Sequence, residues 1–206
     1  MIEFSKCFTG EIDLSLDKKY IRFENTFNKM LRGAQIQKYY ITDNVSQGDI
    51  LYLDGNKYLE EVSSPRSRHH EHPRIVMQGI TGVNENVRLK MSIIPSGVFC
   101  ANSVNYLLID NDIEYFLALC NSKLLNWFFK KLSTNSNVNG YEIDNLPIVI
   151  ADEDTTKNVV DYVNTLLFED KDKQKMINVE NQLNSIVYGI YNLNTQEIDT
   201  IEKSIN

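Results

Sequence analysis

The chain has 206 residues, 42% hydrophobic and 10% aromatic, a composition typical of globular proteins that excludes disordered and collagen-like chains. Its net charge is −7, but residues 1–150 carry 16 Lys and Arg against 17 Asp and Glu, whereas residues 151–206 carry 5 against 11. Because cations that neutralise phosphates supply most of the affinity for nucleic acids, a nucleic-acid surface is expected on the first part and not on the last.

Cysteine usage and the N-terminal sequence predict a cytoplasmic location. Cys7, Cys100 and Cys120 are odd in number, widely spaced and form no C-x-x-C pair, so they are expected to be reduced thiols without a catalytic role. The N-terminus lacks the basic and apolar regions of a signal peptide, and no stretch reaches the apolar length of a membrane span. We therefore expect no membrane partner.

Short apolar stretches alternate with turn signals over residues 1–56. The segment DILYLDGNKYL predicts a strand that ends in a tight turn at Asp54-Gly55. Residues 57–73, KYLEEVSSPRSRHHEHP, lose apolar periodicity and contain two prolines, which predicts an exposed loop with at most a helical turn at its start. Loops of this kind carry function more often than cores do.

The middle of the chain is predicted to be mainly sheet. Residues 74–80, 88–94 and 103–109 are rich in β-branched residues and bounded by Gly, Pro or Asn, so each is expected to form a strand. Apolar residues then repeat at three- and four-residue steps over 112–132, which predicts one amphipathic helix with an apolar face in the core. A polar loop at 133–140 and an extended segment at 141–150 are expected to follow.

Helical periodicity takes over beyond residue 150. It predicts three helices, centred near Val163, Ile186 and Ile201, with the last capped by Asn194 or Thr195. The predicted fold class is therefore α+β. A mixed-sheet recognition domain over 1–150 packs on a central amphipathic helix, and a helical tail over 151–206 packs on that domain or on a separate catalytic domain.

Three kinds of catalytic chemistry lack their motifs. An amino-methyltransferase needs an Asn/Asp-Pro-Pro-aromatic segment and a Gly-rich donor-binding turn, and all four prolines are isolated and no G-x-G-x-x-G occurs. The acid-lysine pattern at 169–171 is weak support for a metal-dependent nuclease. The run Arg68-His69-His70-Glu71-His72 lacks a nearby cysteine and resembles a cationic loop more than a zinc site. No catalytic residue, metal or cofactor is therefore expected in this chain.

Three stretches together carry a family resemblance. MLRGAQIQKYYI (30–41), RIVMQGITG with GVFCANSVNYLLI (74–82, 97–109), and FLALCNSKLLNWFFKKLS with NGYEIDNLPI (116–133, 139–148) resemble the TaqI-like C-terminal specificity domain. The C-terminal IVYGIYNLNTQEIDTIEKSI also resembles the helical tail of those proteins. The resemblance implies a DNA target-recognition module of a bacterial restriction-modification enzyme that acts in phage defence. Its catalytic domain, an adenine-specific DNA methyltransferase present in cis or in trans, would bind S-adenosylmethionine, and an endonuclease activity is possible in the same enzyme.

Double-stranded DNA is thus the expected partner, read by side chains that match base edges: Arg with guanine, Asn or Gln with adenine. The 57–90 region supplies the candidates Lys57, Arg66, Arg68, His69, His70, Arg74, Gln78, Arg88 and Lys90. Arg32 and Lys38 are expected to contact the DNA backbone or to stabilise the fold. Asn102 and Asn105 either close a turn or reach DNA. The Asn121-Ser122 pair inside an apolar helix predicts a tertiary hydrogen bond or a position at the edge of the sheet.

Two alternatives stay open at this point. The chain can be a stand-alone type I-like specificity subunit, although such proteins carry long heptad helices and the helices after residue 150 are short and interrupted. It can also be a small DNA-acting enzyme whose site has no recognisable motif. Turnover by the isolated chain distinguishes the last alternative from a recognition module.

Overall fold

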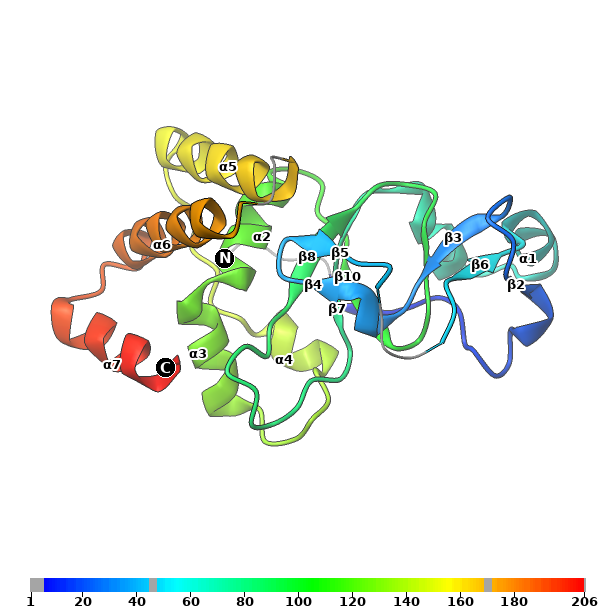
Figure 1. The fold of residues 1–206 in the computed structure, drawn as a ribbon, viewed down its shortest axis with the longest axis horizontal. Coiled ribbons are helices and arrows are strands. Elements are labelled where there is room, and N and C mark those ends of the chain that lie inside the picture. Colours follow the sequence, from blue (N-terminus) through cyan, green and yellow to red (C-terminus); the bar gives the residue numbers. More distant parts are fainter. Residues whose placement is uncertain (1–5, 45–47, 169–171, 206) are drawn as a thin grey trace.

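The computed structural model describes residues 6–44, 48–168 and 172–205. The molecule is elongated, with helices at one end, a sheet in the middle and a smaller sheet with a short helix at the other end (Figure 1). The mixture of helices and separate sheets confirms the predicted α+β class.

The central sheet is antiparallel throughout. Its strands, in spatial order, are β1 (Phe8–Thr9), β10 (Val104–Leu107), β7 (Arg74–Gln78) and β8 (Met91–Ile94). Ile75 and Met77 of β7 belong to the core shared with the helices, whereas Val76 belongs to a second core on the opposite face. Because both faces are covered, β7 is a continuous apolar run between its polar ends. The strands predicted at 74–80, 88–94 and 103–109 are confirmed, each with shorter bounds.

The smaller sheet occupies the far end of the molecule, on the right of Figure 1. Its strands, in spatial order, are β2 (Ile21–Arg22), β6 (Leu51–Leu53), β3 (Asn28–Leu31) and β9 (Phe99–Cys100), and only β3 and β9 are parallel. The expected tight turn after β6 is wrong. Asp54 instead caps helix α1 (Gly55–Glu61), because its carboxylate accepts the Lys57 N–H at 3.3 Å.

Shorter elements connect the two sheets. They are the 3-10 helices η1 (Lys18–Tyr20) and η2 (Gly33–Gln35) and the two-stranded ribbon of β4 (Ile36–Gln37) and β5 (Tyr40–Ile41). Leu31 and Ile36 pack in one core with Val76 of the central sheet. The two sheets are thus joined by apolar packing, so neither end is a detached domain.

The helix predicted over 112–132 is two helices, α2 (Ile113–Asn121) and α3 (Lys123–Leu132). The helix is interrupted at Ser122, whose backbone is extended with ψ of 153°. Its hydroxyl accepts the Leu125 N–H at 3.1 Å and donates to the Leu119 carbonyl at 2.7 Å. Continuous apolar spacing hides this break, because Ser caps a helix N-terminus well without altering the apolar pattern.

The tail consists of α5 (Glu153–Phe168), α6 (Lys173–Ile190) and α7 (Thr195–Ile205), preceded by a short helix α4 (Gly140–Asp144) where an extended segment was expected. Helix α5 packs on α2, while α6 and α7 pack on α3. Val163 and Val187 therefore lie in the same core as Leu117 and Leu125. The tail packs on the recognition part, which is one of the two alternatives expected, and the domain boundary at 150 stays a prediction.

Candidate nucleic-acid interface

The segment predicted to be an exposed loop over 57–73 is largely helical, and its expected helical start is the end of α1. After α1 it forms a 3-10 helix, η3 (Pro65–Glu71), which Ser64 caps by accepting the Ser67 N–H at 3.2 Å. A 3-10 helix has three residues per turn, so side chains three apart share a face. Ser67 and His70 accordingly face inward and are buried, and Arg66 and Arg68 are exposed.

The inward face of η3 anchors the segment to both sheets. The His70 ring stacks on Phe99 with centroids 4.2 Å apart, and its carbonyl accepts the Gly97 N–H at 2.7 Å. His69 lies 2.9 Å from the Tyr106 hydroxyl through Nδ1. Burial, helped by the positive charge of Arg74, lowers the pKa of His69, so this imidazole is neutral near pH 7. His70 therefore stabilises the fold, which corrects its predicted role as a DNA contact.

Arg74 is a second correction. Its guanidinium is fully buried and bonds both carboxylate oxygens of Glu11, at 3.1 and 3.0 Å, and the Val98 carbonyl. It also lies over the Tyr106 ring, 4.5 Å from the centroid. A buried charge that is already paired presents no donor to a base edge. Arg74 joins β7 to the segment before Ile12 and does not read DNA in this structure.

Arg88 is the third. It is 1% exposed, and its guanidinium donates to backbone carbonyls of the 133–137 segment and to the Thr81 hydroxyl. Burial lowers the pKa of Arg88 from its ordinary value. Its donors are used inside the protein, so Arg88 also is no direct DNA contact.

The exposed predicted residues lie on consecutive elements. Lys57 on α1 and Arg66 on η3 are exposed, and within the described residues neither side chain has an ion-pair or hydrogen-bond partner. Arg68 pairs with Glu71 at 2.9 Å on the surface, a contact that costs little to exchange for a phosphate. These three cations come from two successive helices held against the same sheet.

The remaining predicted DNA contacts are spread over the structure, and their side chains already have partners within the protein. Gln78 donates to the Ile36 carbonyl at 2.7 Å, and Arg32 donates to the Asp49 carbonyl at 2.6 Å. Lys90 lies 3.9 Å from Glu85. Lys38 pairs with Glu180 of the tail at 2.6 Å, so it stabilises the fold as one of its two expected roles.

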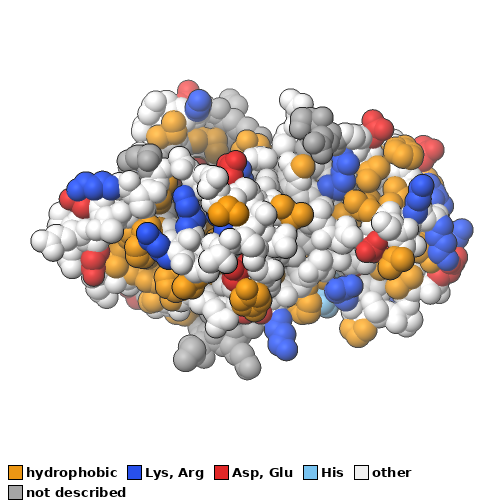
Figure 2. Space-filling model, turned by 90° about the horizontal axis from the view of Figure 1, so that it is seen from below, with side chains coloured by type: hydrophobic (Ala, Val, Ile, Leu, Met, Phe, Trp, Pro, Cys, Tyr) orange, Lys and Arg blue, Asp and Glu red, His pale blue; other side chains and the backbone are white. Residues whose placement is uncertain are grey.

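Further cations adjoin α1 that the sequence did not single out as contacts. Figure 2 shows Lys and Arg side chains gathered at the end of the molecule formed by β2, β6 and α1. Lys18 and Lys19 of η1 are exposed there, and Phe23, which follows shortly after them in the sequence, is 66% exposed. Lys19 pairs with Glu61, which brings η1 next to α1. The sequence does contain one indication of these contacts, the basic residues clustered over 18–38. No neighbouring residue in the sequence, however, links this cluster to α1.

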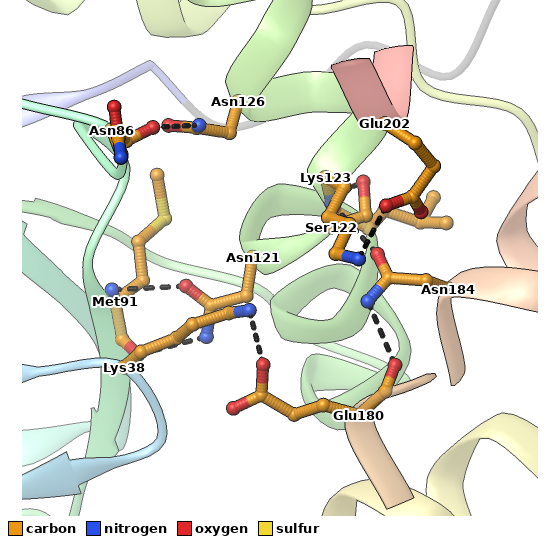
Figure 3. A network of polar contacts seen from close by, with 11 residues as sticks. Lys38, Asn86, Met91, Asn121, Ser122, Lys123, Asn126, Glu180, Asn184 and Glu202 are labelled. Carbon is orange, nitrogen blue, oxygen red and sulfur yellow. Dashed lines mark hydrogen bonds and ion pairs between the residues drawn. The ribbon is translucent and has the colours of Figure 1, made fainter. Parts of the chain in front are cut away.

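The asparagines singled out in the sequence have structural roles. Asn121 both accepts the Met91 N–H at 3.0 Å and donates to the Met91 carbonyl at 2.9 Å, so it lies against the edge strand β8 as predicted (Figure 3). Asn102 lies in the turn between β9 and β10 and donates to Asp13 at 3.1 Å. Asn105 is buried in β10 and donates to the Val138 carbonyl at 2.6 Å. The side-chain amides of Asn102 and Asn105 are both bonded within the protein, so neither is free to contact a base.

Sites for other chemistry are not built in the part of the chain that the structure describes. No group of three or more His, Cys, Asp or Glu is placed to hold a metal ion there, and the acid-lysine pattern at 169–171 lies outside the described residues. Burial raises the pKa of Cys120 to about 12, the opposite of what a nucleophilic thiol needs. No described helix is both long and apolar enough to cross a membrane.

Comparison with known proteins adds two findings. The sequence model of the TaqI-like C-terminal specificity domain matches residues 11–148. Among solved structures, the type IIL restriction-modification enzyme MmeI in complex with DNA superposes with a TM-score of 0.63 over 97% of this chain, at 10% sequence identity. This chain spans 35% of the length of that chain. A search of curated protein sequences finds no match.

Proposed function

The chain belongs to the TaqI-like C-terminal specificity domain family, and from this premise we propose that it reads a DNA target sequence for a restriction-modification enzyme and performs no catalysis itself. The MmeI structure has the same fold over nearly the whole chain. The fold alone does not specify a ligand, so the proposal depends on the surface of this chain.

The observation that carries the proposal is the set of exposed cations on a rigid support. Lys57 and Arg66 have no anionic partner within the described residues, and η3 is fixed by the stacking of His70 on Phe99. Cations held on ordered elements are suited to phosphate contacts that set the position of a protein on a duplex. Arg68 adds a guanidinium that can exchange Glu71 for a phosphate or a guanine edge.

The chemistry of the complete enzyme is a finer part of the proposal. We infer an adenine-specific DNA methyltransferase domain, in cis or in trans, that binds S-adenosylmethionine, because the resemblance to the TaqI-like specificity domain implies a catalytic partner of this kind. An endonuclease in the same enzyme is compatible with this arrangement. Such an enzyme would act on DNA in the bacterial cytoplasm and serve in phage defence.

A selection experiment tests the proposal. The 206-residue chain is incubated at low salt with a pool of randomised DNA duplexes, and the bound fraction is sequenced. Low salt is used because it strengthens phosphate contacts and so compensates for a weak isolated module. We expect enrichment of one short motif; a bound pool identical to the input would contradict the proposal. Calorimetry with S-adenosylmethionine should be flat, and robust methyl transfer or cleavage by the chain would favour an enzyme instead.

A further inference from the structure

Two polar loops lie side by side at the lower edge of Figure 1, residues 79–88 and 133–139. Backbone hydrogen bonds join them: the Thr81 N–H donates to the Ser136 carbonyl at 2.8 Å, and the Val138 N–H donates to the Gly79 carbonyl at 2.9 Å. Ile80 and Asn137 pair as an isolated antiparallel bridge. We call residues 79–88 and 133–139 together the paired loops.

Arg88 holds the paired loops from beneath. Its Nη2 atom donates to the Asn135 carbonyl at 2.7 Å and to the Asn137 carbonyl at 3.5 Å, and its Nη1 atom donates to the Ser133 carbonyl at 3.4 Å. Its Nε atom donates to the Thr81 hydroxyl at 3.3 Å. Within the described residues no carboxylate lies at ion-pair distance from this buried guanidinium. Burying a charge is costly unless it is compensated, and here the carbonyls of the second loop and the charge of the buried Glu142 compensate it, so the geometry of that loop depends on Arg88.

Helix α3 fixes the same segment from the other side. Asn126 accepts the N–H groups of Arg88 and Leu89 at 2.8 and 3.1 Å and donates to the Asn86 carbonyl at 2.8 Å (Figure 3). Asn121 holds Met91 in the same way one helix earlier. The buried amide of Asn126 thus fixes the end of the loop 79–88, the amide of Asn121 fixes the start of β8 that follows it, and the hydrogen bonds of Arg88 fix the second loop in turn.

The outer side of the paired loops consists mainly of uncharged polar groups, with one exposed carboxylate, Glu85, which lies 3.9 Å from Lys90, and with exposed apolar side chains among them. Figure 2 views the molecule from this side, and uncharged groups predominate in the middle of the face, with a few charged side chains among them. Asn84, Ser136 and Asn137 are exposed, and their side chains make no hydrogen bond within the described residues. Ile80 is 63% exposed beside Asn137. These groups contribute nothing to the core, yet the backbone beneath them is held by several buried side chains.

We propose that the paired loops read A·T base pairs of the DNA target, with Asn84 and Asn137 as specificity-determining residues and Arg88 as the positioning residue. A carboxamide matches the donor and acceptor of the adenine edge in the major groove, and an exposed apolar side chain such as Ile80 matches the thymine methyl group. Readers of base edges must be held rigidly, because a small displacement loses a bidentate contact. This inference rests on the proposed function and adds to it the place and the base type that are read.

The test repeats the selection from randomised duplexes with the double variant Asn84→Ala, Asn137→Ala. We expect its preference at one or two A·T positions of the wild-type motif to fall roughly 5- to 150-fold, with affinity for random DNA and the thermal midpoint unchanged. Asn158→Ala, an exposed asparagine on α5, is the matched control and should keep the full motif.

Each outcome has a distinct meaning. A double variant that selects the wild-type motif with equal preference overturns the inference and leaves the proposed function standing. An equal loss of affinity for all sequences also overturns it, because it indicates phosphate contacts or unfolding. A wild-type chain that selects no motif removes the proposed function, and the inference with it.

Arg88→Lys separates positioning from folding. Lysine keeps the charge but lacks the planar fork that reaches several carbonyls at once. We expect faster hydrogen exchange at the N–H groups of Thr81 and Val138 and a loosened preference at the same A·T positions. A loss of global stability with the motif intact would show that Arg88 is only a structural residue.

Discussion

The substitution Arg74→Met is expected to lower the free energy of unfolding, because it leaves a buried charge without its partner. The side chains of Arg74 and Glu11 are 0% and 1% exposed, and two N···O contacts of 3.1 and 3.0 Å join them. Removing the guanidinium leaves a buried carboxylate without its counter-ion, which costs about 3–5 kcal/mol. With a urea slope of about 2–3 kcal/mol/M, the midpoint should fall by about 1–2.5 M.

Two matched variants make this reasoning refutable. Arg68→Met breaks an exposed ion pair, with side chains 67% and 46% exposed, and should cost about 0–1 kcal/mol. The double variant Glu11→Leu, Arg74→Met removes both buried charges and should be more stable than Arg74→Met alone. If Arg74→Met costs no more than Arg68→Met and instead changes the DNA motif selected, Arg74 is a DNA contact and the buried pair has been misjudged.

Three further predictions concern charge and exposure. Arg66→Ala should weaken binding to all DNA sequences alike and lower the slope of log affinity against log salt by about 0.9, whereas Lys157→Ala on the tail should change neither in the same titration. Because burial and neighbouring cations lower the folded-state pKa of His69, the unfolded chain binds more protons at this site. Stability should therefore fall as the pH drops through about 6.5, and urea midpoints measured across this range should depend less on pH in His69→Gln. Burial raises the pKa of Cys7 and Cys120 to about 12, so a thiol-reactive disulfide should label both far more slowly in native buffer than in urea; equal rates would contradict the burial.

Local patterns predicted the longer strands of the central sheet, but they missed most of the short strands and some of the helix boundaries. The strand at 74–78 is evident because β-branched and apolar residues run between polar ends, and that run depends only on nearby residues. The break at Ser122 was missed because apolar spacing continues through it. Helix α4 was missed although its signal is local: the Asn139 N–H donates to the Glu142 carboxylate at 2.9 Å, the second half of a capping box.

The candidate interface was harder to predict than the fold, because partners distant in the sequence decide which cations are free. Arg74 pairs with Glu11, which precedes it by 63 residues, and Arg88 bonds carbonyls that follow it by 45 to 49 residues. In the sequence these arginines are indistinguishable from Arg66, which is exposed. The structure therefore separates residues that hold the surface from residues that form it.

The most direct test of the central claim, that this chain reads DNA sequence, compares two dissociation constants at one salt concentration. One is for a duplex carrying the motif selected by the wild-type chain, and the other is for the same bases in shuffled order. A single correctly read base pair is worth about 1–3 kcal/mol, so the account predicts binding to the motif at least about fivefold tighter than to the shuffled duplex. Equal affinity for the two duplexes would contradict it.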